Sequence, residues 1–177
     1  MYWIFGYGSL MWYPGFPYQN RRRALLRGYR RAYAMFSTRN RGNSERPGLV
    51  LSLIPGGVCE GIAYQVAAEH WETAIAYLDQ REGLDRAHKR VWVPVQWPEN
   101  ARSMAQPALT YLPLSSYPNY IPCLPPGRQA ELVARGVGST GSSLEYLNLL
   151  MKELRALSIH EPELEALHQA ALDRHRS

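Results

Sequence analysis

The sequence contains only two cysteines, Cys59 and Cys123, and no apolar run long enough to cross a bilayer. Two cysteines form at most one disulfide, which excludes a disulfide scaffold and a Cys-rich zinc site. We expect both thiols to be reduced and structural. The first residues also lack the charged flank and apolar stretch of a signal peptide. We therefore expect a cytoplasmic protein without a membrane partner.

Acidic residues are missing from the first 44 positions, where eight arginines occur. They fit three interpretations: a phosphate-binding stripe for nucleic acid, a solvated strand surface, or bidentate partners for the carboxylate of a small anionic substrate. The sign of the charge leaves all three open. The arginines are Arg21, Arg22, Arg23, Arg27, Arg30, Arg31, Arg39 and Arg41.

The chain of 177 residues has the length of one domain, which we assign to residues 1–177. With 46% hydrophobic and 20% charged residues, its composition excludes disorder as the main state. Two-domain dehydrogenases and kinases need a longer chain.

Short apolar and aromatic segments separated by Gly and Pro predict strands in the first two thirds of the chain. We expect the strands at 2–7, 24–36, 49–54, 58–66, 91–97 and 108–112. The sequence Pro55-Gly56-Gly57 is typical of a hairpin connection. One-face spacing of apolar residues predicts a helix at 69–82, and later helices lie at 129–135, from Ser142, and from Pro162 to Arg174.

Strands come first, with one inserted helix, and the C-terminal third is helical. This order disfavours a doubly wound parallel sheet, in which strands and helices alternate throughout. It favours an α+β fold with a barrel-like, mostly antiparallel sheet.

The segment Gly6-Tyr7-Gly8-Ser9-Leu10-Met11 directly follows the first strand. Glycines on both sides of Tyr7 let a ligand approach main-chain N–H groups, which suits stabilisation of a developing oxyanion. An aromatic-rich tight turn explains the same residues equally well. Met11 stands where a Gly-x-Ser-x-Gly elbow needs glycine, so Ser9 is not the nucleophile of a serine hydrolase.

Glu82 continues the apolar face of the helix at 69–82, in line with Trp71, Ile75 and Leu78. Gly83 marks the helix end, whose partial negative charge disfavours an ionised acid. Both features predict a raised pKa for Glu82, in the range of a general base. Arg81 points about 100° away on the helix, so we expect that it does not neutralise Glu82. An ion-paired glutamate at a helix end is the alternative.

The string from Gly136 to Gly141 matches Gly-x-Gly-x-x-Gly, but a helix precedes it and no βαβ unit follows, so it does not predict a dinucleotide site. We expect a flexible loop whose free amides could meet an anion. The serines that follow form a capping box, Ser142-Ser143-Leu144-Glu145. Tyr146 then offers either a hydroxyl donor to a pocket or ordinary packing. The five histidines show no zinc spacing, so no metal is expected.

Several ordered motifs resemble the ChaC-type γ-glutamylcyclotransferases over nearly the whole chain. These motifs are residues 5–12 (FGYGSLMW), 16–19 (FPYQ), Ser37-Thr38, Arg41-Gly42, Pro47-Gly48, 61–64 (GIAY), 77–82 (YLDQRE) and 139–147. The loop is shared by the wider superfamily. The 77–82 motif and Glu145-Tyr146-Leu147 are more specific to the ChaC branch.

The resemblance implies an α+β fold with a small mixed, mostly antiparallel β-barrel flanked by helices, and a carbon–nitrogen lyase without a cofactor. Its activity would be cleavage of glutathione to 5-oxoproline and cysteinylglycine. By position, Glu82 would be the proton acceptor and residues 6–11 the substrate loop. We further expect Tyr146 to contact substrate and Arg41, or Arg39, to bind the glycine carboxylate.

One segment departs from the family pattern. Family members commonly have a Gly-rich stretch ending in Tyr after the glutamate, whereas Glu82 is followed by Gly83-Leu84-Asp85-Arg86. Cleavage of other γ-glutamyl amines or dipeptides is therefore one alternative, and an inactive basic binding module is another. The expected partner is a small-molecule substrate, with no nucleic acid, and the sequence leaves the oligomeric state open.

Overall fold

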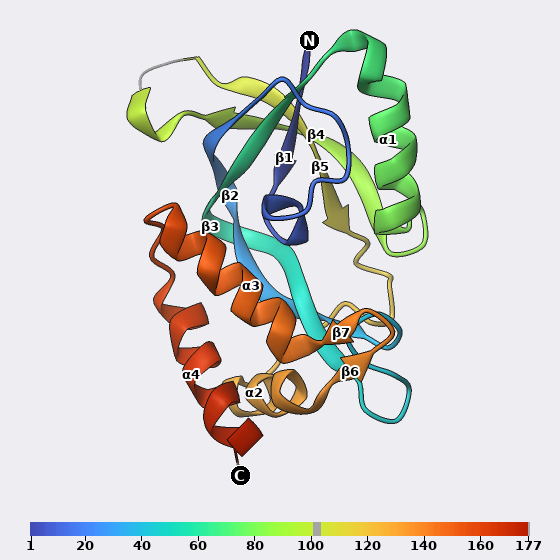
Figure 1. Cartoon of the computed structure of the whole chain (residues 1–177), viewed down its shortest axis with the longest axis vertical. Coiled ribbons are helices and arrows are strands. Elements are labelled where there is room, and N and C mark those ends of the chain that lie inside the picture. Colours follow the sequence, from blue (N-terminus) through green and yellow to red (C-terminus); the bar gives the residue numbers. More distant parts are fainter. Residues whose placement is uncertain (101–103, 177) are drawn as a thin grey trace. The chain divides into compact units, whose positions relative to one another are not determined.

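The computed structural model describes residues 1–100 and 104–176 (Figure 1). Its internal contacts divide the chain into two compact units. Unit 1 comprises Met1–Arg31 and Pro55–Tyr117, and unit 2 comprises Ala32–Ile54 and Pro118–Ser177.

Five strands form a closed barrel in the order β1-β3-β2-β4-β5. In unit 1, β1 pairs antiparallel with β3 and parallel with β5, while β4 pairs antiparallel with β2 and β5. The predicted mixed, mostly antiparallel barrel is therefore confirmed. The strands are β1 (Tyr2–Gly6), β2 (Asn20–Ser37), β3 (Gly48–Val66), β4 (His88–Gln96) and β5 (Gln106–Pro113); the short helix η2 (Pro98–Asn100) follows β4.

The hairpin predicted at Pro55-Gly56-Gly57 is wrong, because β3 runs through these residues as one strand. Gly56 and Gly57 have φ angles of 92° and 80°, which only glycine adopts without strain. A Cβ on Gly57 would lie 3.3 Å from Cβ of Arg30 on the neighbouring strand. The two glycines therefore bend β3 locally instead of reversing it, as glycines in strands often do.

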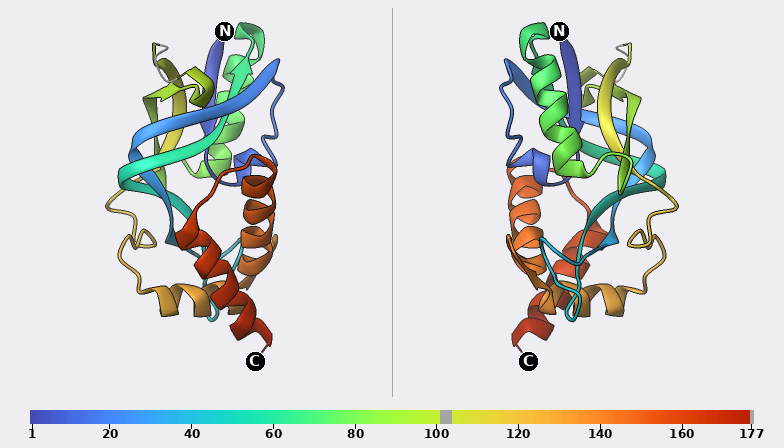
Figure 2. Two further views of the ribbon diagram at one scale, coloured as in Figure 1. Left: turned by 90° about the vertical axis from the view of Figure 1, so that its left-hand side faces the viewer. Right: turned by 90° about the vertical axis from the view of Figure 1, so that its right-hand side faces the viewer.

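Helix α1 (Ala68–Glu82) confirms the helix predicted at 69–82 (Figures 1 and 2). Its inner face buries Ala74, Ile75 and Leu78. At its N-terminal half, the Trp71 ring stacks on Trp92 of β4, with centroids 5.7 Å apart. Gly83 ends the helix in the left-handed conformation, with φ 64° and ψ 57°.

Unit 2 contains three helices, α2 (Pro126–Arg135), α3 (Ser143–Ala156) and α4 (Pro162–Arg176), which pack on one another (Figures 1 and 2). The predicted N-cap of α3 is confirmed, since Ser142 Oγ accepts from the Glu145 amide at 2.9 Å. Ser143 is buried and bonds both main-chain groups of Leu49, which ties α3 to β3 within this unit.

The prediction of a flexible loop with free amides at Gly136–Gly141 is wrong. The segment forms a small hairpin of β6 (Val137–Gly138) and β7 (Gly141–Ser142). The amides of Ser139 and Thr140 donate to the carbonyls of Arg39 and Asn40 at 2.9 and 3.0 Å. An anion would have to displace these bonds.

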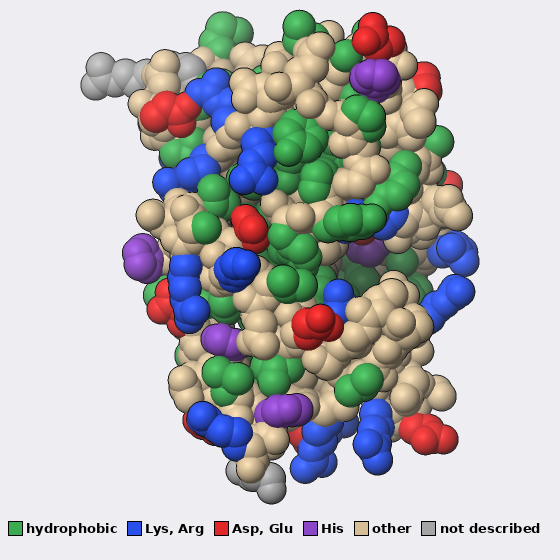
Figure 3. All heavy atoms as spheres, viewed as in Figure 1, with side chains coloured by type: hydrophobic (Ala, Val, Ile, Leu, Met, Phe, Trp, Pro, Cys, Tyr) green, Lys and Arg blue, Asp and Glu red, His purple; other side chains and the backbone are tan. Residues whose placement is uncertain are grey.

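Several of the early arginines have partners within their own unit. Arg22 pairs with Glu99, Arg23 with Glu60 at 2.6 Å, and Arg41 with Glu145 at 2.9 Å. Arg31 is only 4% exposed and does not fit the interpretation of a solvated strand surface. That interpretation fits the exposed members of the set, which are Arg21, Arg27, Arg30 and Arg39. On the face drawn in Figure 3, Lys and Arg side chains lie among Asp, Glu and apolar groups.

Both thiols are free, as expected. Cys59 is fully buried, which raises its thiol pKa, whereas Cys123 is exposed and does not fit the expected structural role. Among the described helices, none combines the length and apolar character needed to span a membrane.

We predict that Tyr33→Phe stabilises the fold. Tyr33 is 2% exposed, and its hydroxyl has no hydrogen-bond partner among the described residues. A buried unsatisfied hydroxyl costs ~1–3 kcal/mol, so removing it should raise the free energy of unfolding by about 1 kcal/mol in urea denaturation.

Tyr64→Phe is the matched control, because the buried Tyr64 hydroxyl donates to the Leu10 carbonyl at 2.6 Å. This variant should lose about 1 kcal/mol. A Tyr33→Phe variant destabilised as much as Tyr64→Phe would show that the Tyr33 hydroxyl has a partner in solution.

Candidate active site

The predicted substrate loop leaves β1 at Gly6 and continues into the short helix η1 (Ser9–Met11). A Cβ on Gly6 would lie 2.7 Å from Cβ of Leu10, closer than side chains pack. The chain therefore turns back on itself in a way that requires glycine at this position.

Hydrogen bonds with the rest of unit 1 hold the loop in place. Arg31 Nε donates to the Tyr7 carbonyl at 2.6 Å, and Tyr64 Oη donates to the Leu10 carbonyl at 2.6 Å. The Tyr7 hydroxyl in turn donates to the Tyr111 carbonyl at 3.1 Å. The loop backbone is thus fixed by three side-chain bonds, although it lies outside the regular strand.

The main-chain amides at the centre of the loop keep their hydrogen-bonding capacity. In the part of the chain that the structure describes, the N–H groups of Gly8, Ser9 and Leu10 donate to no other residue. The Met11 amide bonds the Gly8 carbonyl at 2.9 Å and closes the turn behind them. Such a row of rigidly held donors suits an oxygen that acquires negative charge.

Glu82 is the last residue of α1, and its side chain is 20% exposed. Burial raises the pKa of its carboxyl group, while His88 and Arg81 act in the opposite direction. The predicted raised pKa is confirmed, and its main cause is the removal of the carboxylate from water.

Arg81 lies closer to Glu82 than the helix geometry predicted, but the pKa of Glu82 stays raised, so Arg81 does not cancel the effect of burial. Arg81 Nε lies 3.7 Å from Glu82 Oε1, which is ion-pair distance. The same guanidinium donates to Ser9 Oγ at 2.8 Å and to the Tyr13 carbonyl at 2.7 Å. One arginine therefore contacts both the carboxyl group at the end of α1 and the predicted substrate loop, so Glu82 and Ser9 share a side-chain partner.

A second cluster of polar side chains accompanies Glu82 on α1 and β5. Tyr111 Oη donates to Asp79 Oδ1 at 2.7 Å, and Arg90 Nε lies 3.4 Å from the same oxygen. Burial and the Asp79 carboxylate hold the pKa of Tyr111 far above its usual range, with a smaller contribution from Glu82. Tyr111 therefore stays protonated and serves as a donor.

Arg41 and Tyr146, the two other predicted site residues, belong to unit 2. Arg41 Nη1 donates to Glu145 Oε2, and its Cζ lies 5.6 Å from the centre of the Tyr146 ring. Tyr146 is 8% exposed and meets the Tyr33 ring edge-on at 6.3 Å. The structure thus groups Arg41 and Tyr146 with each other.

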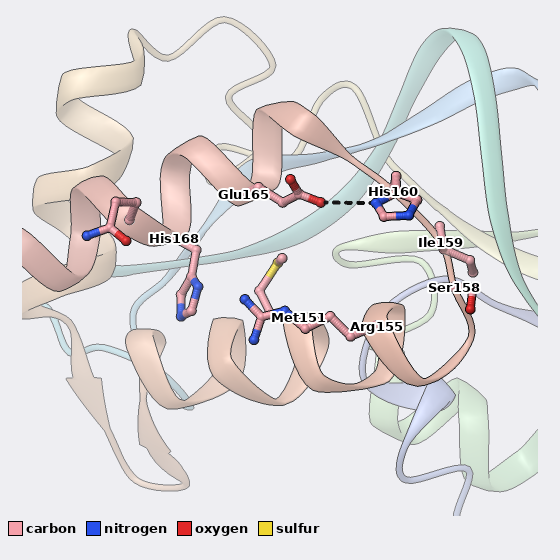
Figure 4. Close-up of a pocket in the computed structure, with 8 residues that line it drawn as sticks. Met151, Arg155, Ser158, Ile159, His160, Glu165 and His168 are labelled. Carbon is pink, nitrogen blue, oxygen red and sulfur yellow. Dashed lines mark ion pairs between the residues drawn. The ribbon is translucent and has the colours of Figure 1, made fainter.

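Unit 2 also carries a shallow groove of about 540 Å³ between α3 and α4 (Figure 4). Met151, Arg155 and His168 line it, with an ion pair between His160 and Glu165 at 3.7 Å. None of the predicted site residues lines this groove. Across residues 1–100 and 104–176, no cluster of His, Cys, Asp and Glu has the composition of a metal site.

Sequence analysis missed two residues of this site. Arg31 lies in a run of arginines and carries no distinguishing signal, because its role depends on its inward orientation. His88 donates through Nδ1 to the Glu82 carbonyl at 2.6 Å, six residues beyond the residue it contacts. Its only signal is its place just after the segment that departs from the family pattern.

Comparison with known proteins places this chain in a family. The family model described as ChaC-like protein matches residues 2–174. The human glutathione-specific gamma-glutamylcyclotransferase 1 is 33% identical over 172 residues, which cover 96% of this chain and 76% of the human protein. The glutathione-specific gamma-glutamylcyclotransferase of Schizosaccharomyces pombe is 32% identical over 184 residues, with coverage of 93% and 90%.

Among solved structures, a glutathione-specific gamma-glutamyl cyclotransferase from yeast shares the fold. Its TM-score is 0.85 at 22% sequence identity, and the match covers 98% of this chain and 99% of the yeast chain. Since the family model spans both units and nearly all of the residues, the chain belongs to the ChaC-like family.

Proposed function

We propose that this protein cleaves glutathione by intramolecular cyclisation, releasing 5-oxoproline and cysteinylglycine. The observation that carries the proposal is the pairing of a buried carboxyl group of raised pKa, Glu82, with a rigid loop of available amides, joined by Arg81. The names of the relatives, which are glutathione-specific enzymes, support the choice of substrate.

In the proposed mechanism Glu82 is the general base. Its carboxylate takes a proton from the substrate α-ammonium, and the freed amine attacks the γ-glutamyl carbonyl to form a C–N bond. The tetrahedral intermediate then expels the amine of cysteinylglycine and closes the lactam. Glu82 carries both protons released by the attacking nitrogen to the departing nitrogen, which leaves as an ammonium, so the enzyme ends unchanged.

The loop amides of Gly8, Ser9 and Leu10 would stabilise the oxyanion of that intermediate. One lost donor of this type costs ~3 kcal/mol of transition-state stabilisation. Nucleophile and electrophile already belong to one molecule, and correct orientation of such a pair contributes ~7–11 kcal/mol. The protein therefore has to fold the glutamyl arm, which is the task we assign to residues 6–11.

For unit 2, the proposal rests on side-chain chemistry. A guanidinium binds carboxylates well, so we assign the glycine carboxylate to Arg41, with Arg39 as the alternative. Tyr146 would contact the substrate beside Arg41, on which its ring packs.

We further propose that residues 1–177 act as a single domain in the cytoplasm. The family match over residues 2–174 supports one functional domain. Two free thiols are consistent with the reducing compartment in which glutathione keeps thiols reduced.

A second candidate is the same reaction on other γ-glutamyl amines or dipeptides. It is favoured by the segment Gly83-Leu84-Asp85-Arg86, which replaces the Gly-rich stretch ending in Tyr that family members commonly have after the glutamate. A panel of γ-glutamyl peptides with detection of 5-oxoproline separates the two candidates: glutathione specificity requires kcat/KM for glutathione to exceed the others.

Glu82→Gln should abolish 5-oxoproline release from glutathione, because the amide cannot accept the ammonium proton. The fold should persist or become more stable near pH 7. The pKa of Glu82 is raised in the folded state, so its ionisation at neutral pH opposes folding, and glutamine removes that cost. Thermal unfolding and a product assay test both parts.

Glu69→Gln is the matched control, since Glu69 lies in the first turn of α1 and its side chain is 78% exposed. It should retain wild-type turnover. Normal 5-oxoproline release by Glu82→Gln would refute the role of Glu82 as base.

Ser9→Ala should lower kcat/KM about tenfold without abolishing turnover. The substitution removes the bond between Ser9 Oγ and Arg81 and loosens the loop, but it keeps the main-chain amides. A hydrogen bond to a charged group contributes ~1.5–3 kcal/mol. A tenfold change in rate corresponds to ~1.4 kcal/mol, so the loss of this bond accounts for it. Complete loss of turnover would instead indicate that the serine hydroxyl takes part in the chemistry.

A further inference from the structure

The segment in which this chain departs from its family pattern forms a compact turn at the end of α1. Gly83 accepts from the amides of Arg86 and Ala87 at 3.1 and 2.9 Å. The Asp85 amide donates to the His88 carbonyl at 2.9 Å, and Leu84 and His88 form a short parallel bridge. The turn therefore folds the first residue of β4 back onto the last residue of α1.

His88 occupies this position with an almost completely buried ring, 8% exposed. Its Nδ1 donates to the main-chain carbonyl of Glu82 at 2.6 Å. A carbonyl in the last turn of a helix has no partner within the helix, so this bond satisfies a group that would otherwise need water. The contact fixes the backbone of the same residue that we propose as the base.

The other charged and titratable groups around Glu82 in unit 1 are already committed. Arg81 is shared between Glu82 and the substrate loop. Arg90 lies beside Asp79, and the protonated Tyr111 donates to Asp79. Apart from Arg81, His88 is the one group in this set that acts on Glu82 directly and favours its ionised form.

We propose that His88 is a positioning residue for Glu82, holding the end of α1 through Nδ1 and stabilising the ionised carboxylate through its ring. This inference rests on the proposed role of Glu82 as general base. It gives a function to the turn that replaces the family's Gly-rich stretch, because this turn places the imidazole of His88 beside Glu82, the proposed base.

Two substitutions separate the two effects. His88→Asn keeps a donor, because the Asn amide nitrogen is attached to Cγ as Nδ1 is, but it removes the imidazole ring. His88→Ala removes both. His70→Asn is the matched control, since His70 lies on α1 with a side chain that is 50% exposed. For each variant, kcat and KM for glutathione and the pH profile of kcat/KM are measured.

We expect His88→Asn to keep kcat within about threefold of wild type at the pH optimum. The acid limb of its pH profile should move to higher pH, because loss of the favourable interaction raises the Glu82 pKa further. His88→Ala should lose about tenfold in kcat with little change in KM, since the unbound helix end no longer fixes the base. His70→Asn should match wild type in both respects.

An acid limb in His88→Asn at the wild-type position, or wild-type kcat in His88→Ala, would overturn the inference. If His88→Ala does not fold, the pH profile of His88→Asn decides alone. The Glu82→Gln test is independent of these variants. An active Glu82→Gln enzyme would refute the role of Glu82 as base. An inactive Glu82→Gln enzyme together with His88 variants of wild-type behaviour would refute only the role of His88.

Discussion

A carboxyl group at the negative end of a helix and largely out of water is the constraint on which this site depends. Both conditions disfavour the ionised form of Glu82. An acid in this position is costly for folding at neutral pH, and it is retained in a structure where simple packing would favour an apolar residue. The same cost gives Glu82 the property that its proposed role as base requires, which is tighter binding of a proton than in an exposed glutamate.

Other residues of unit 1 hold that carboxyl group and the loop after β1 in fixed positions. Arg81 contacts both, and Arg31 and Tyr64 hold the loop carbonyls from the buried side. Loops carry function best when surrounding groups lock their geometry. Here the side chains of Arg31 and Tyr64 donate hydrogen bonds to main-chain carbonyls of the loop, so the main-chain amides of the loop keep their capacity to donate.

The turn after Glu82 illustrates how a local sequence departure can preserve a site. Gly83 provides the left-handed residue that ends α1, and the following residues return the chain so that His88 meets the helix end. The carbonyl of the proposed base is satisfied by an imidazole, which both restrains it and favours its charge.

The sequence alone determined the order of most elements, the end of α1 at Glu82 and the glycine loop, because periodicity, glycine positions and local motifs act over a few residues. The mixed barrel was implied by the resemblance of these motifs to the ChaC-type enzymes. Tertiary structure decided what those rules do not reach. It turned Pro55–Gly57 into a bent strand, paired the Gly136–Gly141 amides with Arg39 and Asn40, and directed Arg31, Arg81 and His88 inward. The sequence does not show whether an arginine or histidine side chain faces water or the protein interior. The packing of strands and helices that are distant in the sequence decides this orientation.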